Sequence, residues 1–315
     1  MSTSGFYAAD VSKSELVIAC EADDAEIVRV ANGAAAIDAW LDRLPAGSLI
    51  GMEATGTYHR LLAARASARG FTVYVVNPRD FHFYARSVGA RGKTDPLDAR
   101  LLARYIAHEH THLHRYVPPS ALCEQLCALL ERRAVLVRTR QTLVQSLADL
   151  PTLQPHTQVA LRALDDLVAA LDSQLATLNA SDPATASLVR RLRTICGVGP
   201  LVSTLLAALL QRFAFRHADA LVAYVGLDPR PDESGSRRGR RRLSKRGHPE
   251  WRRLLVAAAM SAARTRVWGD YVLGHKNKGL PSTAVHVILA RKMLRVAFAL
   301  YKSGNDFFAP EIKLT

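Results

Sequence analysis

The chain has 315 residues, a formal net charge of +14 and an isoelectric point near 10.0. Its length suits about two domains, and a composition of 49% apolar and 22% charged residues is that of a globular protein, not a disordered one. No run of about 18 consecutive apolar residues occurs, which excludes a membrane-spanning helix. The positive excess predicts a polyanionic partner, either nucleic acid or an anionic membrane surface.

Residues 1–117 alternate between short apolar runs and helical patterns, which predicts an α/β domain. The last strand is the clearest, because it is rich in β-branched and aromatic residues and is followed by Asn77-Pro78. Three strands, a helix, a strand, a helix and a strand predict a mixed sheet. The expected strands are Phe6–Ala9, Leu16–Ala19, Ile27–Val30, Leu49–Glu53 and Phe71–Val76, and the expected helices are Ala34–Leu44 and Leu61–Arg69.

Residues 120–180 predict a long helical hairpin whose two helices are separated by Pro151 and Pro155. In the second helix the apolar residues step by four and three, which is the spacing of a coiled-coil seam. The seam would pack either within one chain or against a second chain. Its residues are Leu164, Val168, Leu171, Leu175 and Leu178, and the stripe in the first helix is Leu122, Leu126, Leu129, Val137, Leu143, Val144 and Leu147.

From about residue 185 the pattern is helical again, with a Gly-x-Gly turn between two apolar helices. The turn contains Gly197 and Gly199 and is similar to a helix-hairpin-helix. Its amides and the following helix N-terminus could bind a DNA phosphate. A plain turn between two helices is the alternative.

A strongly basic segment follows, from Arg230 to Arg253. It holds ten Arg or Lys and three acids, so half of the net charge lies in 24 residues. Its glycines and serines predict a loop. Because the segment is internal and flanked by apolar helices, contact with nucleic acid is favoured over a solvated basic tail.

The four cysteines indicate a reducing compartment. Only Cys123 and Cys127 are close in sequence, and no second Cys or His pair completes a zinc site, so structural thiols are favoured over zinc ligands. The other two are Cys20 and Cys196. The N-terminus has no basic segment followed by an apolar one, so no signal peptide is expected and the cytoplasm is the expected compartment.

Four acidic residues are candidates for chemistry. Asp10 and Glu53 each end a predicted strand, and Asp95 and Asp98 begin a predicted helix. If the four carboxylates converge beyond the strand ends of the sheet, they repel one another unless divalent cations neutralise them. Two Mg²⁺ ions bound there could assist phosphodiester transfer. The structural alternative makes Asp95, followed by Pro96, a helix cap, with Asp98 suited to the helix dipole and the other two acids in ordinary turns.

The acids lie in ordered motifs, and further motifs follow about 140 residues downstream. The first set is Tyr7-x-x-Asp10-Val-Ser-Lys, Glu53-Ala-Thr-Gly-Thr-Tyr58, Val76-Asn-Pro and Lys93-Thr-Asp95-x-x-Asp98-Ala-Arg, and the second is Ile195-Cys-Gly-Val-Gly-Pro, Tyr224-Val-Gly-Leu-Asp-Pro-Arg230, Glu233-Ser234-Gly235 and Leu243-Ser-Lys-Arg-Gly247. Together they resemble the two conserved parts of the IS110-type transposases, which are DEDD recombinases with a RuvC-like, RNase H-type domain. The resemblance covers nearly the whole chain, although the helical middle is similar to the family's coiled-coil insertion only in type.

The resemblance implies a transposase of an insertion sequence in which the four acids bind Mg²⁺ or Mn²⁺. It also implies that Ser234 attacks DNA and forms a covalent intermediate, since an unactivated hydroxyl needs such a site to act as a nucleophile. Ser236 and Ser244 lie nearby, and the residues alone do not choose among the three. The family uses a structured noncoding RNA that pairs with donor and target DNA. A homodimer or tetramer is expected, with the serine of one subunit facing the acids of another. The expected location is the nucleoid of a prokaryotic cytoplasm.

The expected organisation is a RuvC-like α/β domain over 1–118, a helical hairpin over 119–183 and a mainly helical transposase domain over 184–315. The basic segment would bind phosphates. Two features depart from the family pattern, namely Pro96 directly after Asp95 and an unusually dense arginine cluster. The residues expected to contact phosphates are Arg237, Arg238, Arg240, Arg241, Arg242, Lys245 and Arg246, with Gly197 and Gly199 of the turn.

Two other functions fit parts of the pattern. A metal-dependent nuclease of the RuvC class, such as a junction resolvase, would need the acids but not the serine. A non-catalytic nucleic-acid-binding protein would need only the basic segment. A membrane-surface role fits least well, because the basic residues form no amphipathic stripe.

Overall fold

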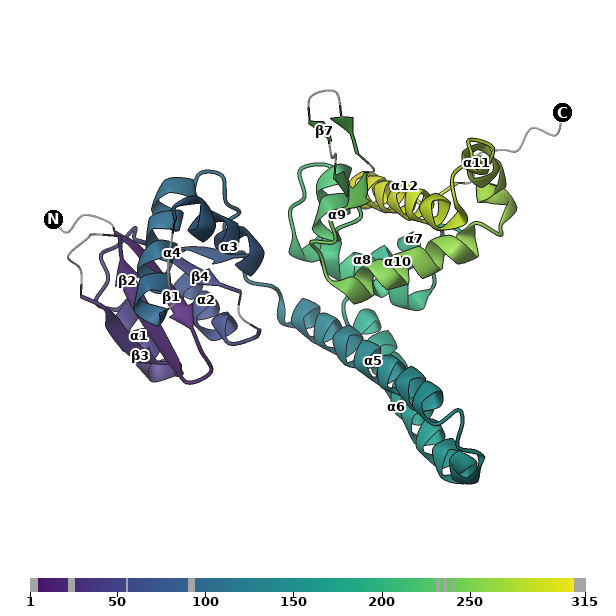
Figure 1. Cartoon of the computed structure of the whole chain (residues 1–315), viewed down its shortest axis with the longest axis horizontal. Helices are drawn as coiled ribbons and strands as arrows, with labels where there is room; N and C mark the ends of the chain where they lie inside the picture. Colours follow the sequence, from purple (N-terminus) through teal and green to yellow (C-terminus); the bar gives the residue numbers. More distant parts are fainter. Residues whose placement is uncertain are drawn as a thin grey trace. The chain divides into compact units, whose positions relative to one another are not determined.

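The computed structural model describes residues 5–21, 26–54, 56–89, 94–230, 233–234, 237–239 and 241–308, with 233–234 and 237–238 as backbone only. The chain forms two compact units, Met1–Pro118 and Pro119–Thr315 (Figure 1). In the described part of the chain, no helix is long and apolar enough to cross a membrane.

The first unit is built on a five-stranded mixed sheet, as the sequence predicted. The strand order is β3-β2-β1-β4-β5, in which β1, β2 and β3 are antiparallel neighbours and β4 and β5 run parallel to β1. Parallel neighbours end at the same edge of a sheet, so β1, β4 and β5 share one C-terminal edge. The strands are β1 (Phe6–Val11), β2 (Glu15–Cys20), β3 (Val28–Ala31), β4 (Leu49–Glu53) and β5 (Thr72–Val76).

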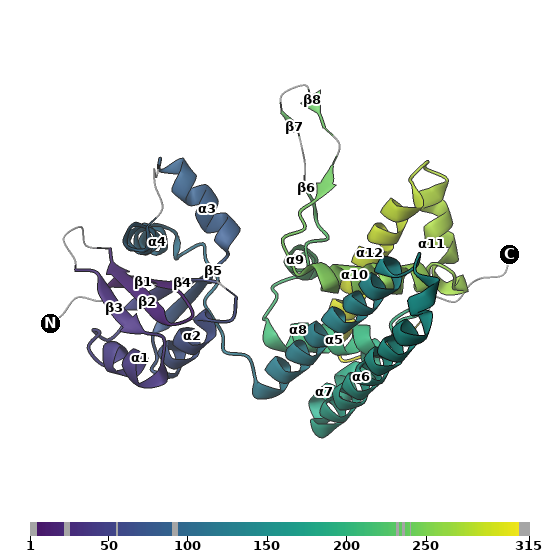
Figure 2. The same cartoon turned by 60° about the horizontal axis from the view of Figure 1, so that its bottom comes forward.

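Two helices cover each face of this sheet (Figure 2). One core packs α1 (Ala34–Leu41) and α2 (His59–Ala68) against one face through residues such as Ile37 and Leu62. The other core packs α3 (Pro78–Ser87) and α4 (Asp95–Glu109) against the opposite face through Phe81 and Ile106. The predicted helices and strands occur with ends shifted by up to three residues, whereas α3 was not predicted.

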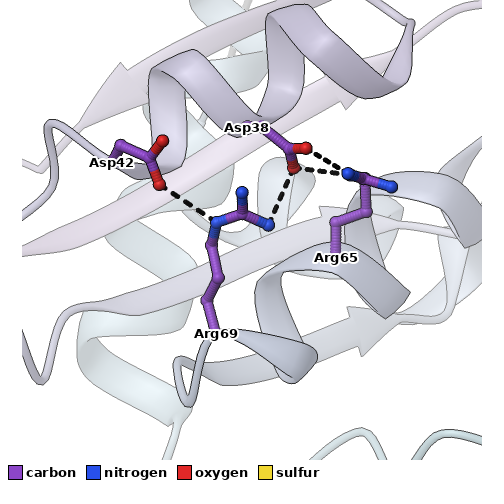
Figure 3. Close-up of polar contacts among 4 residues, drawn as sticks. All are labelled: Asp38, Asp42, Arg65 and Arg69. Carbon is purple, nitrogen blue, oxygen red and sulfur yellow. Dashed lines mark hydrogen bonds and ion pairs between the residues drawn. The ribbon is translucent and has the colours of Figure 1, made fainter.

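Figure 3 shows an ion-pair cluster that joins α1 to α2. Arg65 donates to both carboxylate oxygens of Asp38, and Arg69 bridges Asp38 and Asp42 with N–O distances of 2.8 and 3.1 Å. The hydrogen bond from Arg65 lowers the pKa of Asp38, and the charges of both arginines add to this effect. Because the folded-state pKa is depressed, this carboxylate stabilises the fold at neutral pH, and the contribution is lost as the pH falls below about 4.

The second unit is a helical body with four very short strands. Its central helix is α8, in which every residue from Val202 to Leu210 is buried. The surrounding helices pack on it in one continuous apolar core. The elements are α5 (Ala121–Ser146), a 3-10 turn (Pro151–Leu153), α6 (Gln154–Ser181), α7 (Pro183–Leu192), α8 (Pro200–Arg212), α9 (Ala218–Tyr224), β6 (Pro229–Arg230), β7 (Glu233–Ser234), β8 (Arg237–Arg238), β9 (Arg242–Leu243), α10 (Pro249–Ala262), α11 (Arg266–Lys276) and α12 (Ser282–Ser303).

Helices α5 and α6 form the predicted hairpin, and the seam packs within the chain (Figure 1). Leu175 is buried in the core shared with α8, which joins the base of the hairpin to the helical body. Arg133 makes two hydrogen bonds to Asp172, at 2.6 and 3.0 Å, and Arg140 pairs with Asp165 at 2.6 and 3.2 Å. These bidentate pairs fix the register of the two helices.

The cysteines are free thiols, as expected for a reducing compartment. Cys123 and Cys127 are buried in the apolar core of the second unit, and the Cys123 thiol donates to the carbonyl oxygen of Ala208 at 3.3 Å. The hydrogen bond with Cys123 raises the pKa of Cys127, and burial adds to this effect. A thiol held protonated in this way is a poor metal ligand, so Cys127 acts as a packing residue.

Candidate active site and nucleic-acid interface

Asp10 and Glu53 lie side by side at the ends of β1 and β4. The residues just before them are register partners in the parallel ladder, so the two acids are neighbours at a strand spacing of about 4.8 Å. Two residues before Glu53, Gly51 faces α4, because a Cβ there would lie 2.2 Å from Ile106 Cγ1. Side chains alternate along a strand, so Glu53 points to the face that α4 covers.

Asp10 points to the same face. Its antiparallel register partner is Val17, and Val17 packs against Ala99 of α4. At the other end of the helix, the ring of His110 lies 5.2 Å from that of Phe6, at the start of β1. Helix α4 therefore begins near the C-terminal end of β1. We call the place where β1 and β4 end on this face the acid edge.

The first turn of α4 brings the other two candidate acids to the acid edge. Asp98 is half-buried and Asp95 is exposed. The structural alternative placed Asp95 at the N-cap, and this was wrong, because Thr94 occupies the N-cap position and Asp95 and Pro96 are the first two helical residues. Both acids stand in the first turn, as the helix-dipole part of that alternative expected. Since the backbone before a proline disfavours the helical conformation, the boundary was expected one residue later than it occurs. Helix capping therefore does not explain why an acid stands at position 95.

Asn32 joins the two loops that follow the acid-bearing strands. Its side-chain amide donates to the carbonyl oxygen of Ser12 at 2.8 Å, just after β1, and to that of Tyr58 at 3.2 Å, beyond β4. Its backbone amide donates to Ser14 at 2.9 Å. These bonds hold the loops after Asp10 and Glu53 at a fixed separation. A lone Asn after a strand carries no periodic signal, so this role was not predicted.

The donor set at the acid edge suits a hard divalent cation. Carboxylate oxygens are the ligands that Mg²⁺ and Mn²⁺ prefer, and like charges on neighbouring strands need a counter-charge. Within the described residues, no three His, Cys, Asp or Glu side chains stand close enough together to hold an ion. The acids thus have the right chemistry and the right face, and an ion would have to draw their side chains together.

The basic segment forms an antiparallel ribbon where the sequence predicted a loop. Strand β6 pairs with β9, and β7 pairs with β8, with Glu233 opposite Arg238 and Ser234 opposite Arg237. We call β6–β9 the basic ribbon, and Figure 2 shows β7 and β8 beyond α9. Strands of two residues, rich in arginine, carry no β signal of their own. Only the Gly235-Ser236 pair is typical of a hairpin connection.

The base of the ribbon is held by close backbone contacts. Gly226 has a φ of +73°, and a Cβ there would lie 2.7 Å from the backbone nitrogen of Arg246. Ser244 is buried, its hydroxyl donates to an Asp228 carboxylate oxygen, and its amide donates to the carbonyl of the same residue at 2.9 Å. Because its hydroxyl is enclosed and engaged, Ser244 has a structural role and cannot reach a DNA phosphate without unfolding the ribbon base.

The described basic side chains of this segment are exposed, except for the half-buried Arg252. Arg230 and Arg242 are register partners on β6 and β9. Like charges directly opposite each other disfavour an antiparallel pair, and a bound phosphate would reduce that effect. Among the other residues expected to contact phosphates, Arg241, Lys245 and Arg246 are exposed, Arg237 and Arg238 are described as backbone only, and Arg240 lies outside the described residues. The predicted nucleophile Ser234 is also described as backbone only.

The two glycines of the predicted phosphate-binding turn differ in backbone conformation and in the space around them. Gly197 has a φ of +94°, and a Cβ there would lie 2.4 Å from Ala262 Cβ and 2.9 Å from the Ala258 carbonyl oxygen of α10. Packing alone explains this glycine. Gly199 is the N-cap of α8, has a φ of −88° and has nothing within 4 Å of a Cβ. Only Gly199 therefore stands where an incoming phosphate could approach.

We expect Gly197→Ala to lower the free energy of unfolding by about 2 kcal/mol or more, because it adds both strain and overlap. Gly199→Ala should cost less, about 1 kcal/mol at most, because alanine is a poorer N-cap but its Cβ would meet nothing within 4 Å. Urea unfolding, followed by the helical circular-dichroism signal, measures both changes. Equal midpoints for the two variants would contradict the packing role of Gly197.

Most of the chain is similar to known transposases and to curated recombination proteins. Residues 8–154 match the model of the DEDD transposases of IS110 elements, and residues 189–272 match that of the transposase IS116/IS110/IS902 family. A pilin gene-inverting protein of Moraxella bovis is 32% identical over 266 residues, which are 81% of this chain and 80% of the relative. The chain belongs to the IS110 family of transposases. A second pilin gene-inverting protein, from Moraxella lacunata, is 31% identical over the same shares.

Membership of this family makes the protein a DNA recombination enzyme, so its substrates are DNA. The family model that covers the first unit is that of DEDD transposases, which implies dependence on a divalent metal. The acid edge lies within the residues that this model matches, and the basic ribbon lies within those of the second model.

Proposed function

We propose that this protein is the transposase of an insertion sequence, which cuts and exchanges DNA strands under the guidance of a structured noncoding RNA. The observation that carries the proposal is the acid edge, where Asp10 and Glu53 end neighbouring parallel strands beneath the first turn of α4. The strand order and the antiparallel pairing of the first three strands support a RuvC-like, RNase H-type fold for this unit.

Asp10, Glu53, Asp95 and Asp98 would hold Mg²⁺ or Mn²⁺. When bound, the metal would neutralise the carboxylates and stabilise the charge that develops on the phosphodiester oxygens. The two strand acids are fixed by the sheet, whereas the two helix acids depend on the packing of α4 through Ala99. The protein's own contribution would therefore be one pair of carboxylates on neighbouring strands and a second pair on the first turn of α4.

Ser234 would be the nucleophile. Its Oγ forms a bond to the scissile phosphorus while the bond from phosphorus to the leaving deoxyribose oxygen breaks. The serine gives up its proton to solvent, and the departing oxygen takes one up. A hydroxyl of the partner strand then attacks the same phosphorus and releases the serine, so the number of phosphodiester bonds is conserved. Burial of Ser244 supports Ser234 over that neighbour.

The partners would be donor DNA, target DNA and the RNA. A dimer or tetramer would let the serine of one subunit act with the acids of another, and the basic ribbon would neutralise phosphates beside the serine. Gene inversion, for which the Moraxella relatives are named, fits an enzyme that rejoins what it cuts. The reaction would take place at the nucleoid of a prokaryotic cytoplasm.

Sequencing of copurified RNA tests the guided part of the proposal. When the gene is expressed with its native flanks, we expect one structured RNA from a flank to be enriched on the purified protein, because the excess of +14 charges favours a polyanion. Expression with the flanks deleted is the control. Recovery of only bulk cellular RNA in both cases would contradict guidance by an RNA of the element.

A further inference from the structure

Helix α3 carries an exposed cationic and aromatic face that no predicted role uses. Arg79, His82, Phe83 and Arg86 follow at i, i+3, i+4 and i+7, which places them on one side of the helix. All four side chains are exposed, and Phe83 is 50% exposed. We call these four residues the α3 face.

The opposite side of α3 is occupied by packing. The rings of Phe81 and Tyr84 lie 6.2 and 4.7 Å from the ring of Tyr105 on α4. Burial raises the pKa of the Tyr105 hydroxyl, and the charge of Asp80 adds to this effect. Asp80 is half-buried and lies one turn before Tyr84, on the side of α3 that packs on α4. The rings of Phe81 and Tyr84 pack α3 against α4. The third ring, that of Phe83, takes no part in this packing.

The charges on the α3 face are arranged around this exposed ring. The guanidinium carbon of Arg79 lies 5.7 Å from the Phe83 ring centroid, and the His82 ring lies 6.1 Å away. An exposed aromatic ring flanked by arginines is suited to stack on an unpaired base while the guanidinium groups bind the adjoining phosphates. A duplex offers no such base, because its bases are stacked on one another.

The α3 face begins at the acid edge. Glu53 is the register partner of Val76, the last residue of β5, and the backbone amide of Ala54 donates to the Val76 carbonyl at 2.9 Å. The next residue, Asn77, caps α3 by accepting from the Arg79 amide at 2.9 Å. Figure 2 shows α3 beside α4 on the same side of the sheet. A DNA strand bound at the acid edge would thus reach α3 a few nucleotides away from the acids.

We propose that the α3 face binds an unpaired stretch of the DNA strand that lies at the acid edge, with Phe83 stacking on a base and Arg79 and Arg86 on the phosphates. The inference rests on the proposed function, because the acids act on DNA and so make DNA, not RNA, the strand at this position. The absence of an acid from the face matches the charge of that strand.

Binding of a short DNA oligonucleotide to the full-length protein tests this, with EDTA present to prevent cleavage. Each probe carries 2-aminopurine at one position of a single strand. Phe83→Ala should weaken binding about tenfold and abolish the quenching of the stacked 2-aminopurine, and Phe83→Trp should restore both. Arg79→Gln should lower the slope of log affinity against log salt by about 0.7, whereas Phe83→Ala should leave the slope unchanged.

Matched controls lie elsewhere in the chain. Phe308, which is 82% exposed, and Arg43, an exposed residue just after α1, should bind as the wild type when changed to Ala and Gln. Wild-type affinity in the Phe83→Ala protein, or a loss seen only with RNA of the same sequence, would overturn the inference. Because binding in EDTA needs no chemistry, an active Asp10→Asn enzyme would refute the proposed function without affecting this result.

Discussion

Ser234→Ala should abolish the covalent DNA–protein product and lower the rate of strand exchange by about 10³-fold or more, while DNA binding persists. The reason is chemical: alanine has no oxygen to form the phosphoester, and the other groups of a site lose most of their effect when the nucleophile is absent. The measurement is a denaturing gel with labelled DNA, on which the wild type gives a band that survives detergent, followed by mass spectrometry of the linked peptide.

The neighbouring serines provide the controls for this experiment. Ser236→Ala should keep full activity, since it removes a hydroxyl two residues away. Ser244→Ala should act differently again, because loss of its bond to Asp228 leaves a buried carboxylate oxygen without that donor and weakens the base of the ribbon. It should lower thermal stability before it lowers the yield of covalent product. Metal-dependent cleavage that continues in Ser234→Ala would favour a nuclease of the RuvC class and refute the serine mechanism.

The sequence predicted the sheet because its signals are local. Each strand of the first unit is a short apolar run with a clear stop, and Asp10 and Glu53 could be recognised as strand ends. That the two acids are neighbours could not be predicted from the residues, since it depends on β1 pairing with β4 across more than 30 residues of intervening chain. That Asp10 and Glu53 are neighbours is thus a product of register, and the position of α4 above them depends on the packing of Ala99 on β2.

In the second unit and on α3, by contrast, local sequence signals were not enough to predict the structure. The basic ribbon was predicted as a loop because of its glycines and serines, whereas in the structure β6 pairs with β9 and β7 pairs with β8. On α3, the sequence Phe81-His-Phe83-Tyr84 gives three aromatic rings within four residues. Periodicity alone does not say which of them faces solvent, and only the packing on Tyr105 separates Phe83 from the other two.

Asp10→Asn and Glu53→Gln should each reduce DNA cleavage by about 10³-fold, because each change removes a charged oxygen ligand while keeping the size of the side chain. Affinity for DNA should stay equal or rise slightly, since a negative charge near the phosphates is removed. Cleavage by the wild type should stop in EDTA and return with Mg²⁺ or Mn²⁺. The measurement is the rate of appearance of cut, labelled DNA in the presence of each metal.

Thermal unfolding separates metal binding from general damage. Mg²⁺ should raise the melting temperature of the wild type, because it binds the folded protein, by an amount set by its concentration relative to the dissociation constant. Asp10→Asn and Glu53→Gln each remove a charged oxygen ligand, so the melting temperature of these variants should respond less to Mg²⁺ than that of the wild type. Asp42→Asn is the matched control, because Asp42 is an exposed acid on the α1 side that pairs with Arg69. It should keep both the response to metal and the activity, whereas full activity in Asp10→Asn would remove the acid edge from the mechanism.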